Sequence, residues 1–138
     1  MGHWGVRSYE VDEAADALDL AFARVCGDAY EDLMDDRNPL TYEQVQERLA
    51  SSETLVAALD VLREEFGNDP ESWDEVGRLA FCGVVVRHAE LGLPIPAVSR
   101  RCAIAWLQSE PIEWDEATKR ELRRKKEIAL LERAGHSD

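Results

Sequence analysis

The chain has 138 residues, and its 29 acidic and 16 basic side chains give it a formal net charge of −13. This length suits one domain, and a hydrophobic fraction of 45% argues for a buried core and against a disordered chain. Because like charges repel, nucleic acid and anionic membrane surfaces are unfavourable partners, and the longest apolar run, residues 79–86, is too short to span a bilayer.

The first predicted helix covers residues 11–26. We expect Asp12 to cap its start and Gly27 to end it. Residues 28–36 add a helical turn or two before Pro39 breaks the chain. The first helix is predicted from apolar residues with helical spacing: Val11, Ala15, Leu18, Phe22 and Val25.

Capping signals predict the next two helices. Thr41 and Gln44 have the spacing of a capping box, which favours a helix over residues 42–50. Ser51 or Ser52 then caps the following helix. The apolar stripe of that helix and the glycine that ends it are Leu55, Leu59, Leu62, Phe66 and Gly67.

Residues 76–91 are apolar on most sides, which predicts the central buried helix of the fold. Its start has two candidates: Pro70 as a first helical residue, and a capping box that begins at Ser72. Gly83 costs the helix about 1 kcal/mol relative to alanine, which close packing by a neighbouring helix offsets. A short strand through residues 84–86 is the alternative, and the helical flanks argue against it.

Two more helices follow a proline-glycine connector, over residues 97–109 and about 116–134. Asp115 is the expected cap of the last helix. The apolar face expected for the first of the two comprises Val98, Cys102, Ala105 and Trp106.

Charge is distributed unevenly along the chain. Residues 1–75 contain 20 acidic and 5 basic side chains, whereas residues 119–126 of the last helix are strongly basic. We interpret the basic stretch as a solvated face that suits the helix dipole and that the acidic N-terminal half can contact. A nucleic-acid-binding stripe and a contact with an acidic protein are the alternatives.

These elements predict an all-α fold, in which residues 1–138 form a single compact bundle of about six or seven helices. We expect residues 1–10 to be a non-helical segment packed on the core. Residues 73–75 recur as residues 114–116 in the sequence Trp-Asp-Glu, which HEAT-like helical pairs would explain. Repeated use of Asp-Glu at helix starts is the alternative.

The three cysteines, Cys26, Cys82 and Cys102, form an odd number without a CxxC pair. This pattern is typical of a reducing compartment rather than of a disulfide framework, so we predict a cytoplasmic protein. Cys82 and His88 lie about 240° apart around a helix, which makes core cysteines and a partly exposed histidine the expected arrangement rather than a metal site.

No motif for catalysis or cofactor binding occurs. The sequence has no HExxH pair, nucleophile elbow, Walker loop or GxGxxG turn, and its acidic stretch at residues 28–36 does not have the ligand spacing and central glycine of a calcium loop. We therefore predict no catalytic residue, no metal and no cofactor.

The candidate partner-binding residues are two aromatic residues near the N-terminus and five carboxylates that follow the first predicted helix. We expect the tryptophan, which lies between glycines, to pack on the core, and an exposed aromatic anchor for a partner is the alternative. The seven candidates are Trp4, Tyr9, Asp28, Glu31, Asp32, Asp35 and Asp36.

The first residues also resemble a known family. Met1-Gly2-x-Trp4-Gly5, followed by Tyr9-Glu10-x-Asp12-x-Ala14-Ala15-Asp16, is similar to the opening of a bacterial family of small acidic proteins of unknown function. This resemblance implies a cytoplasmic, bacterial, helical protein, and it supplies no activity, cofactor or catalytic residue.

Two functional hypotheses follow. The first is a protein-interaction module whose acidic N-terminal surface binds an unidentified, basic partner, as an immunity protein or neutraliser does, with self-association as a further possibility. The second is a small-ligand-binding protein or enzyme with a pocket between helices near Trp73, His88 and Trp106. Neither hypothesis involves nucleic acid or a membrane.

Overall fold

The computed structural model describes residues 7–35, 37, 39–111, 114, 116–134 and 136–137. This part of the chain has a compact all-α fold, which confirms the predicted fold class. Its helices are α1 (Asp12–Cys26), α2 (Asp28–Met34), α3 (Tyr42–Leu49), α4 (Ser52–Phe66), α5 (Glu75–Glu90), α6 (Ala97–Ser109) and α7 (Ala117–Arg133). Two 3-10 turns are η1 (Ser8–Glu10) and η2 (Pro70–Ser72), and two short strands, β1 (Ile95–Pro96) and β2 (His136–Ser137), pair in parallel.

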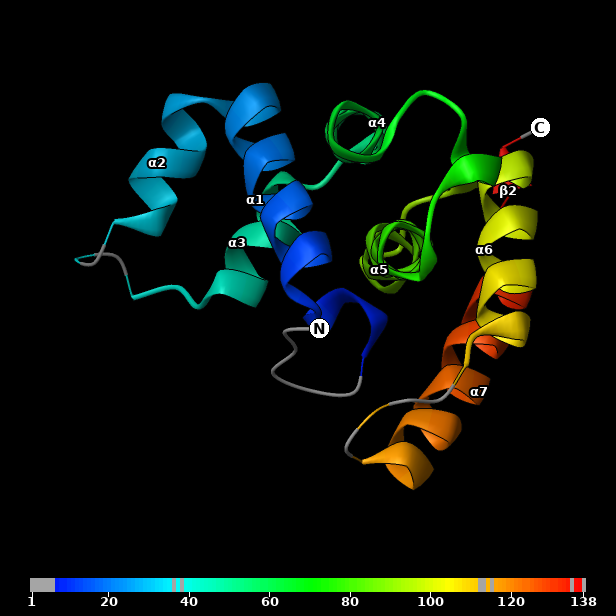
Figure 1. Cartoon of the computed structure of the whole chain (residues 1–138). Coiled ribbons are helices and arrows are strands. Elements are labelled where there is room, and N and C mark those ends of the chain that lie inside the picture. Colours follow the sequence, from blue (N-terminus) through cyan, green and yellow to red (C-terminus); the bar gives the residue numbers. More distant parts are fainter. Residues whose placement is uncertain are drawn as a thin grey trace.

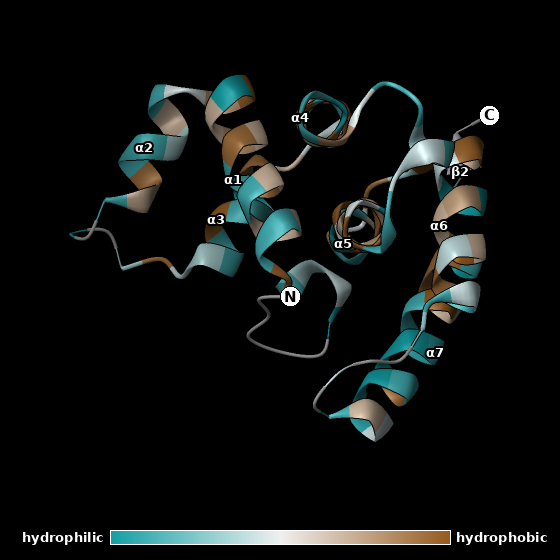
Figure 2. Cartoon of the chain, viewed as in Figure 1, coloured by the Kyte–Doolittle hydropathy of each residue, from teal (hydrophilic) through white to brown (hydrophobic). Residues whose placement is uncertain are grey.

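Helix α5 occupies the centre of the fold. Figure 1 shows it end-on, with α1 and α4 on one side and α6 and α7 on the other. Twelve of its 16 residues are buried, so neighbours cover it on every side. Figure 2 shows that the hydropathy of the helices follows their position: the central α5 is rich in hydrophobic residues, whereas much of the peripheral α7 is hydrophilic. The predicted central helix is therefore confirmed, and residues 84–86 are helical rather than a strand.

Most of the predicted helix ends are where the sequence places them. Thr41 caps α3 in a capping box with Gln44, and Ser51 caps α4. Gly27 and Gly67 end α1 and α4 with φ angles of 53° and 111°, values that L side chains rarely adopt.

Two predicted caps are wrong, and another, Asp115, lies outside the described residues, while Glu116 occupies the N-cap position of α7. Helix α1 starts from Val11, whose carbonyl accepts from the Ala15 amide at 3.0 Å, because the fully buried Val11 side chain anchors this residue just before the helix. Helix α5 is capped by Asp74, whose carboxylate accepts from the Gly77 amide. Ser72 does not serve there because it is the last residue of η2, two positions before the cap, and its hydroxyl donates to the Asp69 carbonyl oxygen.

The N-terminal segment also departs from the expectation of a non-helical stretch. Residues 8–10 form the 3-10 turn η1, with Ser8 and Glu10 buried, and the turn packs on α5. A Cβ on Gly83 would lie 2.6 Å from the Ser8 carbonyl oxygen, so the close neighbour that this glycine admits is the backbone of η1 rather than another helix.

The buried face of α6 differs from the predicted one. Val98 is 72% exposed and Ala105 is exposed as well, whereas Ala103, Trp106 and Leu107 are buried. Helical spacing allows two overlapping apolar faces in this segment, and close packing on α5 selects the one that contains the small Ala103. The Cys82 thiol, for example, lies 3.5 Å from the Ala103 carbonyl oxygen.

Candidate functional site

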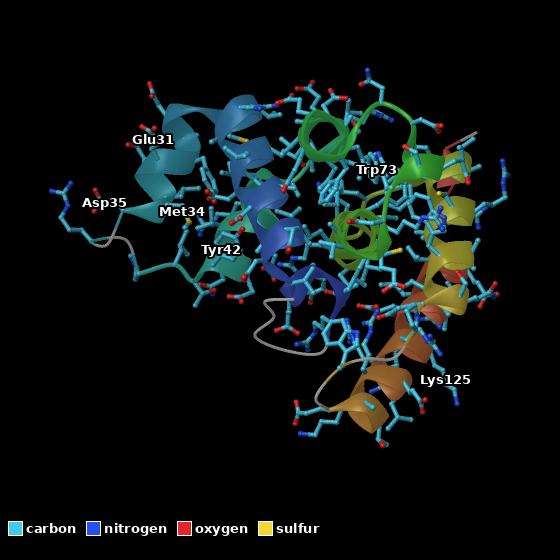
Figure 3. The ribbon with its side chains drawn as sticks, viewed as in Figure 1. Glu31, Met34, Asp35, Tyr42, Trp73 and Lys125 are labelled. Atoms are coloured by element: carbon cyan, nitrogen blue, oxygen red, sulfur yellow. The ribbon has the colours of Figure 1, made fainter. Side chains whose placement is uncertain are left out.

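The carboxylates of α2 form an exposed acidic surface at one end of the molecule. Asp28, Glu31 and Asp32 are exposed, and no ion pair involves them in the part of the chain that the structure describes. Figure 3 shows Glu31 and Asp35 at this end of the fold. We call Asp28, Glu31 and Asp32 the α2 acidic surface.

Local contacts hold α2 in place. Its buried Tyr30 stacks on Phe22 of α1, with ring centroids 5.8 Å apart, and the Tyr30 hydroxyl donates to the Asp19 carboxylate. Burial raises the pKa of Tyr30, so the phenol stays protonated and remains a donor. The α2 acidic surface therefore sits on a helix with a fixed orientation against α1.

Asp35 differs from the other three carboxylates because it already has a cation. It accepts from the backbone and the guanidinium of Arg37, at 2.9–3.0 Å, and the guanidinium lowers the pKa of Asp35. Asp36, the fifth predicted carboxylate, lies outside the described residues, as does Trp4.

Tyr9, the remaining predicted residue, lies away from the α2 acidic surface. It is half-buried in η1, its hydroxyl donates to the Glu90 carboxylate at 2.7 Å, and the Arg87 guanidinium lies 5.5 Å from the ring centre. Burial and the Glu90 carboxylate raise the pKa of Tyr9. These contacts give Tyr9 a structural role, since both its hydroxyl and its ring face have partners within the chain.

The structure separates the three residues around which a ligand pocket was predicted. Trp73 and Trp106 pack with Phe81 in one aromatic cluster, with centroids 5.0–6.4 Å apart. His88 lies near the other end of α5, about 20 Å along the helix axis from its start, and stacks on Phe22.

His88 is fully buried, which corrects the expectation of a partly exposed histidine. Its Nδ1 lies 2.9 Å from the Val84 carbonyl oxygen and its Nε2 lies 2.9 Å from the Thr54 hydroxyl. Burial lowers the pKa of His88 to about 4, so the ring is neutral at pH 7. A neutral ring that donates from Nδ1 must accept from Thr54 at Nε2, and both nitrogens then have structural partners.

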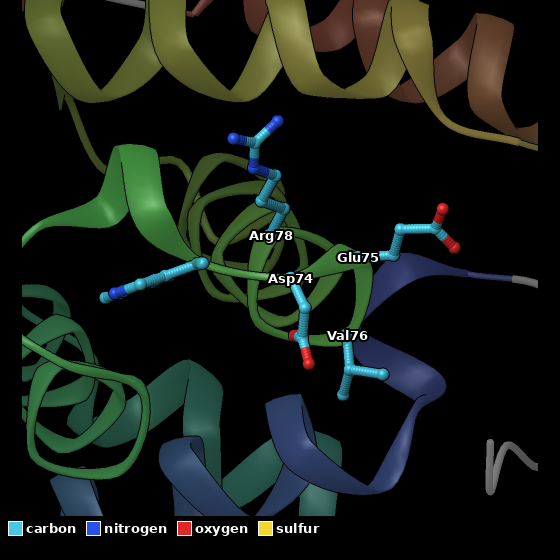
Figure 4. Close-up of a pocket in the computed structure, with 5 residues that line it drawn as sticks. Asp74, Glu75, Val76 and Arg78 are labelled. Carbon is cyan, nitrogen blue, oxygen red and sulfur yellow. The ribbon is translucent and has the colours of Figure 1, made fainter.

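A shallow, open depression lies beside Trp73 at the start of α5, as Figure 4 shows. Two of its polar side chains are engaged in the fold: Asp74 caps α5, and the Arg78 guanidinium donates to the Glu71 carbonyl oxygen and lies 5.1 Å from the Trp106 ring centre. Glu75 also lines the depression with an exposed carboxylate, but Asp74 and Arg78 are not free to act with it in acid–base chemistry.

The basic stretch of α7 contradicts the interpretation as a wholly solvated face. Arg120 is fully buried and pairs with Glu110 at 2.6 Å and with Glu127 at 3.0 Å. Its guanidinium also lies 4.6 Å from the ring centre of Trp114. Among the described residues, the acidic partners of the α7 arginines come from the C-terminal half rather than from the acidic N-terminal half.

Glu127 connects this network to η1. It is 1% exposed and accepts from the Ser8 amide at 2.9 Å and the Ser8 hydroxyl at 3.0 Å. Burial raises the pKa of Glu127, against the effect of Arg120. Arg123 pairs with Glu90 of α5. The sequence contained one sign of the network: Arg120 and Glu127 are seven residues apart and therefore share a helix face.

The cysteines are free thiols, and burial raises the pKa of each of the three, most strongly for the fully buried Cys82. The described residues contain no group of three or more His, Cys, Asp and Glu side chains that could hold a metal ion. Within the same ranges, no helix combines the length and the apolar character that a membrane span requires.

Comparisons with models of known protein families, with curated protein sequences and with solved structures found no match. The arguments about function therefore rest on the residues and contacts described above.

Proposed function

We propose that this protein is a protein-interaction module whose α2 acidic surface binds a basic protein. The observation that supports the proposal most directly is that Asp28, Glu31 and Asp32 are exposed and have no cation partner among the described residues, on a helix that Tyr30 fixes against α1. Four of the five arginines in residues 1–75 are already paired with carboxylates of the same half, as Arg24 is with Glu64 and Arg37 with Asp35.

The surrounding charge reinforces this surface. Residues 12–49 carry eleven acidic and three basic side chains, so their field attracts a cationic protein over a range of about one Debye length. Such steering produces fast, salt-sensitive association, which suits a neutraliser of the immunity type acting in a cytoplasm. The net charge of −13 disfavours nucleic acid as the partner.

The test is capture from the lysate of the native host at low salt, followed by a salt gradient and mass spectrometry. The variant D28N/E31Q/D32N removes the α2 acidic surface, and E53Q/E65Q/E71Q removes three other exposed carboxylates as the matched control. We expect the wild type and the control variant to retain one basic protein in stoichiometric amount, and the α2 variant to lose it.

The association rate of the captured partner then tests steering. It should fall steeply from ~0.01 M to ~0.15 M salt, as the Debye length decreases from about 30 Å to about 8 Å. Equal capture by the α2 variant, or an association rate that does not change with salt, would contradict the proposal.

A further inference from the structure

Helix α7 carries every lysine of the chain on one exposed face. Lys119, Lys125 and Lys126 are the three lysines of the sequence, and all are exposed. At 100° per residue, these lysines and Arg133 lie within about 60° of Leu122, which is itself 57% exposed. We call Lys119, Leu122, Lys125, Lys126 and Arg133 the α7 outer face.

The cations on the opposite side of α7 already have partners in the fold. Arg120 and Arg123 pair with buried or half-buried glutamates, and the Arg124 guanidinium donates to the Glu110 carbonyl oxygen at 2.7 Å. On the outer face, only Lys119 is paired in the described part of the chain, with the exposed Glu116. The arginines therefore dock α7, and the outer lysines are available to another molecule.

The complementary surface lies at the far end of the same molecule. Figure 3 shows Glu31 on α2 and Lys125 on α7 at opposite ends of the fold. A single chain cannot bring these two surfaces together, whereas two copies can. The α7 outer face also offers an apolar side chain to bury, since Leu122 is 57% exposed.

We propose that the α7 outer face docks on the α2 acidic surface of a second copy of this chain. The contact is head to tail, so each addition leaves one free acidic surface and one free basic face, and the assembly keeps growing unless its rotation closes it into a ring. This inference goes beyond the proposed function because it assigns a role to α7 and needs no basic partner protein.

Ionic strength controls this association in two directions. Two molecules of charge −13 repel each other at long range, and a Debye length of about 8 Å at 0.15 M salt screens most of that repulsion. Near 1 M salt, where the length is about 3 Å, the contacts between lysines and carboxylates are screened too. Association should therefore be greatest at intermediate salt.

The test is sedimentation and light scattering of the purified chain over a range of concentrations at about 0.15 M salt. The variant K125E/K126E destroys the α7 outer face, E31K/D32K destroys the α2 acidic surface, and R48E/R101E reverses two exposed arginines elsewhere as the matched control. We expect the average mass of the wild type and of the control to rise with concentration, and each of the other variants alone to stay monomeric.

An equimolar mixture of K125E/K126E and E31K/D32K is the decisive measurement. The first variant keeps its acidic surface and the second keeps its lysines, and the two reversed surfaces are complementary as well, so the mixture should associate in alternating copies although neither variant associates alone. A monomeric wild type, unimpaired association of either variant alone, or a mixture that stays monomeric would overturn the inference. Failure here leaves the proposed basic partner intact, because that proposal is tested by capture with the α2 variant.

Discussion

The two sides of α5 are held to their neighbours by different forces. Toward α1 and α4, the contacts are made by fully or nearly fully buried apolar side chains such as Phe22, Leu55 and Leu62, and His88 is a neutral polar group among them. On the side of η1 and α7, the contacts depend on buried or half-buried charges: Glu127 joins α7 to Ser8 of η1 and pairs with Arg120, and Arg123 pairs with Glu90 of α5. When an apolar side chain is shortened, the free energy of unfolding falls in proportion to the atoms removed and the cavity left. A buried ion pair adds little net stability, yet removal of one partner lowers the free energy of unfolding strongly.

Removal of Arg120 should have the largest effect. In R120M, Glu127 loses its closest cation while it remains buried, so we expect unfolding free energy to fall by about 3–5 kcal/mol. Chemical denaturation at pH 7 measures this loss.

The double variant R120M/E127Q sharpens the interpretation. A glutamine at this position carries no charge and its amide oxygen can still accept from Ser8, so the double variant should recover part of the stability lost in R120M. No recovery would mean that the loss in R120M comes from packing rather than from an unpaired charge.

On the apolar side, His88 should make stability depend on pH. Its folded-state pKa of about 4 lies below the ordinary value of 6.5, so the unfolded chain binds the proton more readily. The contribution of neutral His88 to the free energy of unfolding is therefore fully present above pH 6.5 and is lost as the pH falls toward 4, and the total change is about 3 kcal/mol. Denaturant titrations at a series of pH values check it.

The control is H88Q, which cannot titrate at this position. The raised pKa of Glu127 acts in the opposite direction, because it weakens stability as pH rises above the ordinary glutamate range, and both proteins share it. The difference between wild type and H88Q therefore isolates the histidine. Parallel pH curves for the two proteins would show that burial does not hold the ring neutral.

Gly83→Ala tests the close contact between α5 and η1. The new methyl group would meet the Ser8 carbonyl oxygen at 2.6 Å and Tyr9 Cα at 2.8 Å, so backbone must shift. The gain of about 1 kcal/mol in helix propensity offsets part of the overpacking cost, and we expect a net loss of about 1–2 kcal/mol. Faster hydrogen exchange of the Ser8 amide should accompany it. A variant more stable than the wild type would contradict this expectation, because it would mean that the backbone of η1 shifts without a loss of stability.

Val98→Ser should have the smallest effect. Val98 is 72% exposed on α6 and belongs neither to the apolar contacts nor to the buried ion pairs compared above. Its replacement should therefore change the free energy of unfolding by no more than about 0.5 kcal/mol. Thermal unfolding measures it. A loss of 2 kcal/mol or more, typical of a core position, would favour the α6 face that the sequence predicted.

Local chemistry in the sequence was enough to predict the helices and most of their ends. The capping box at Thr41, the cap at Ser51 and the glycines at 27 and 67 depend only on residues a few positions apart, so no knowledge of neighbours was needed. The uninterrupted apolar character of residues 79–86 likewise identified α5 as the central helix, because only a helix covered on all sides can bury it. The local excess of acidic residues likewise identified the carboxylates of α2, and Asp28, Glu31 and Asp32 are exposed in the structure.

Tertiary structure decided which face of each helix is buried and which charges are paired. The chosen face of α6 depends on the surface of α5, which no periodicity within α6 contains. Arg120 is buried between Glu110 and Glu127, and Glu127 in turn accepts from Ser8, 119 positions away along the chain. A basic stretch that looks solvated in sequence therefore divides into docked arginines and exposed lysines. Sequence patterns report interactions within a few residues, whereas the pairing of a charge is determined by long-range contacts that exist only in the folded chain.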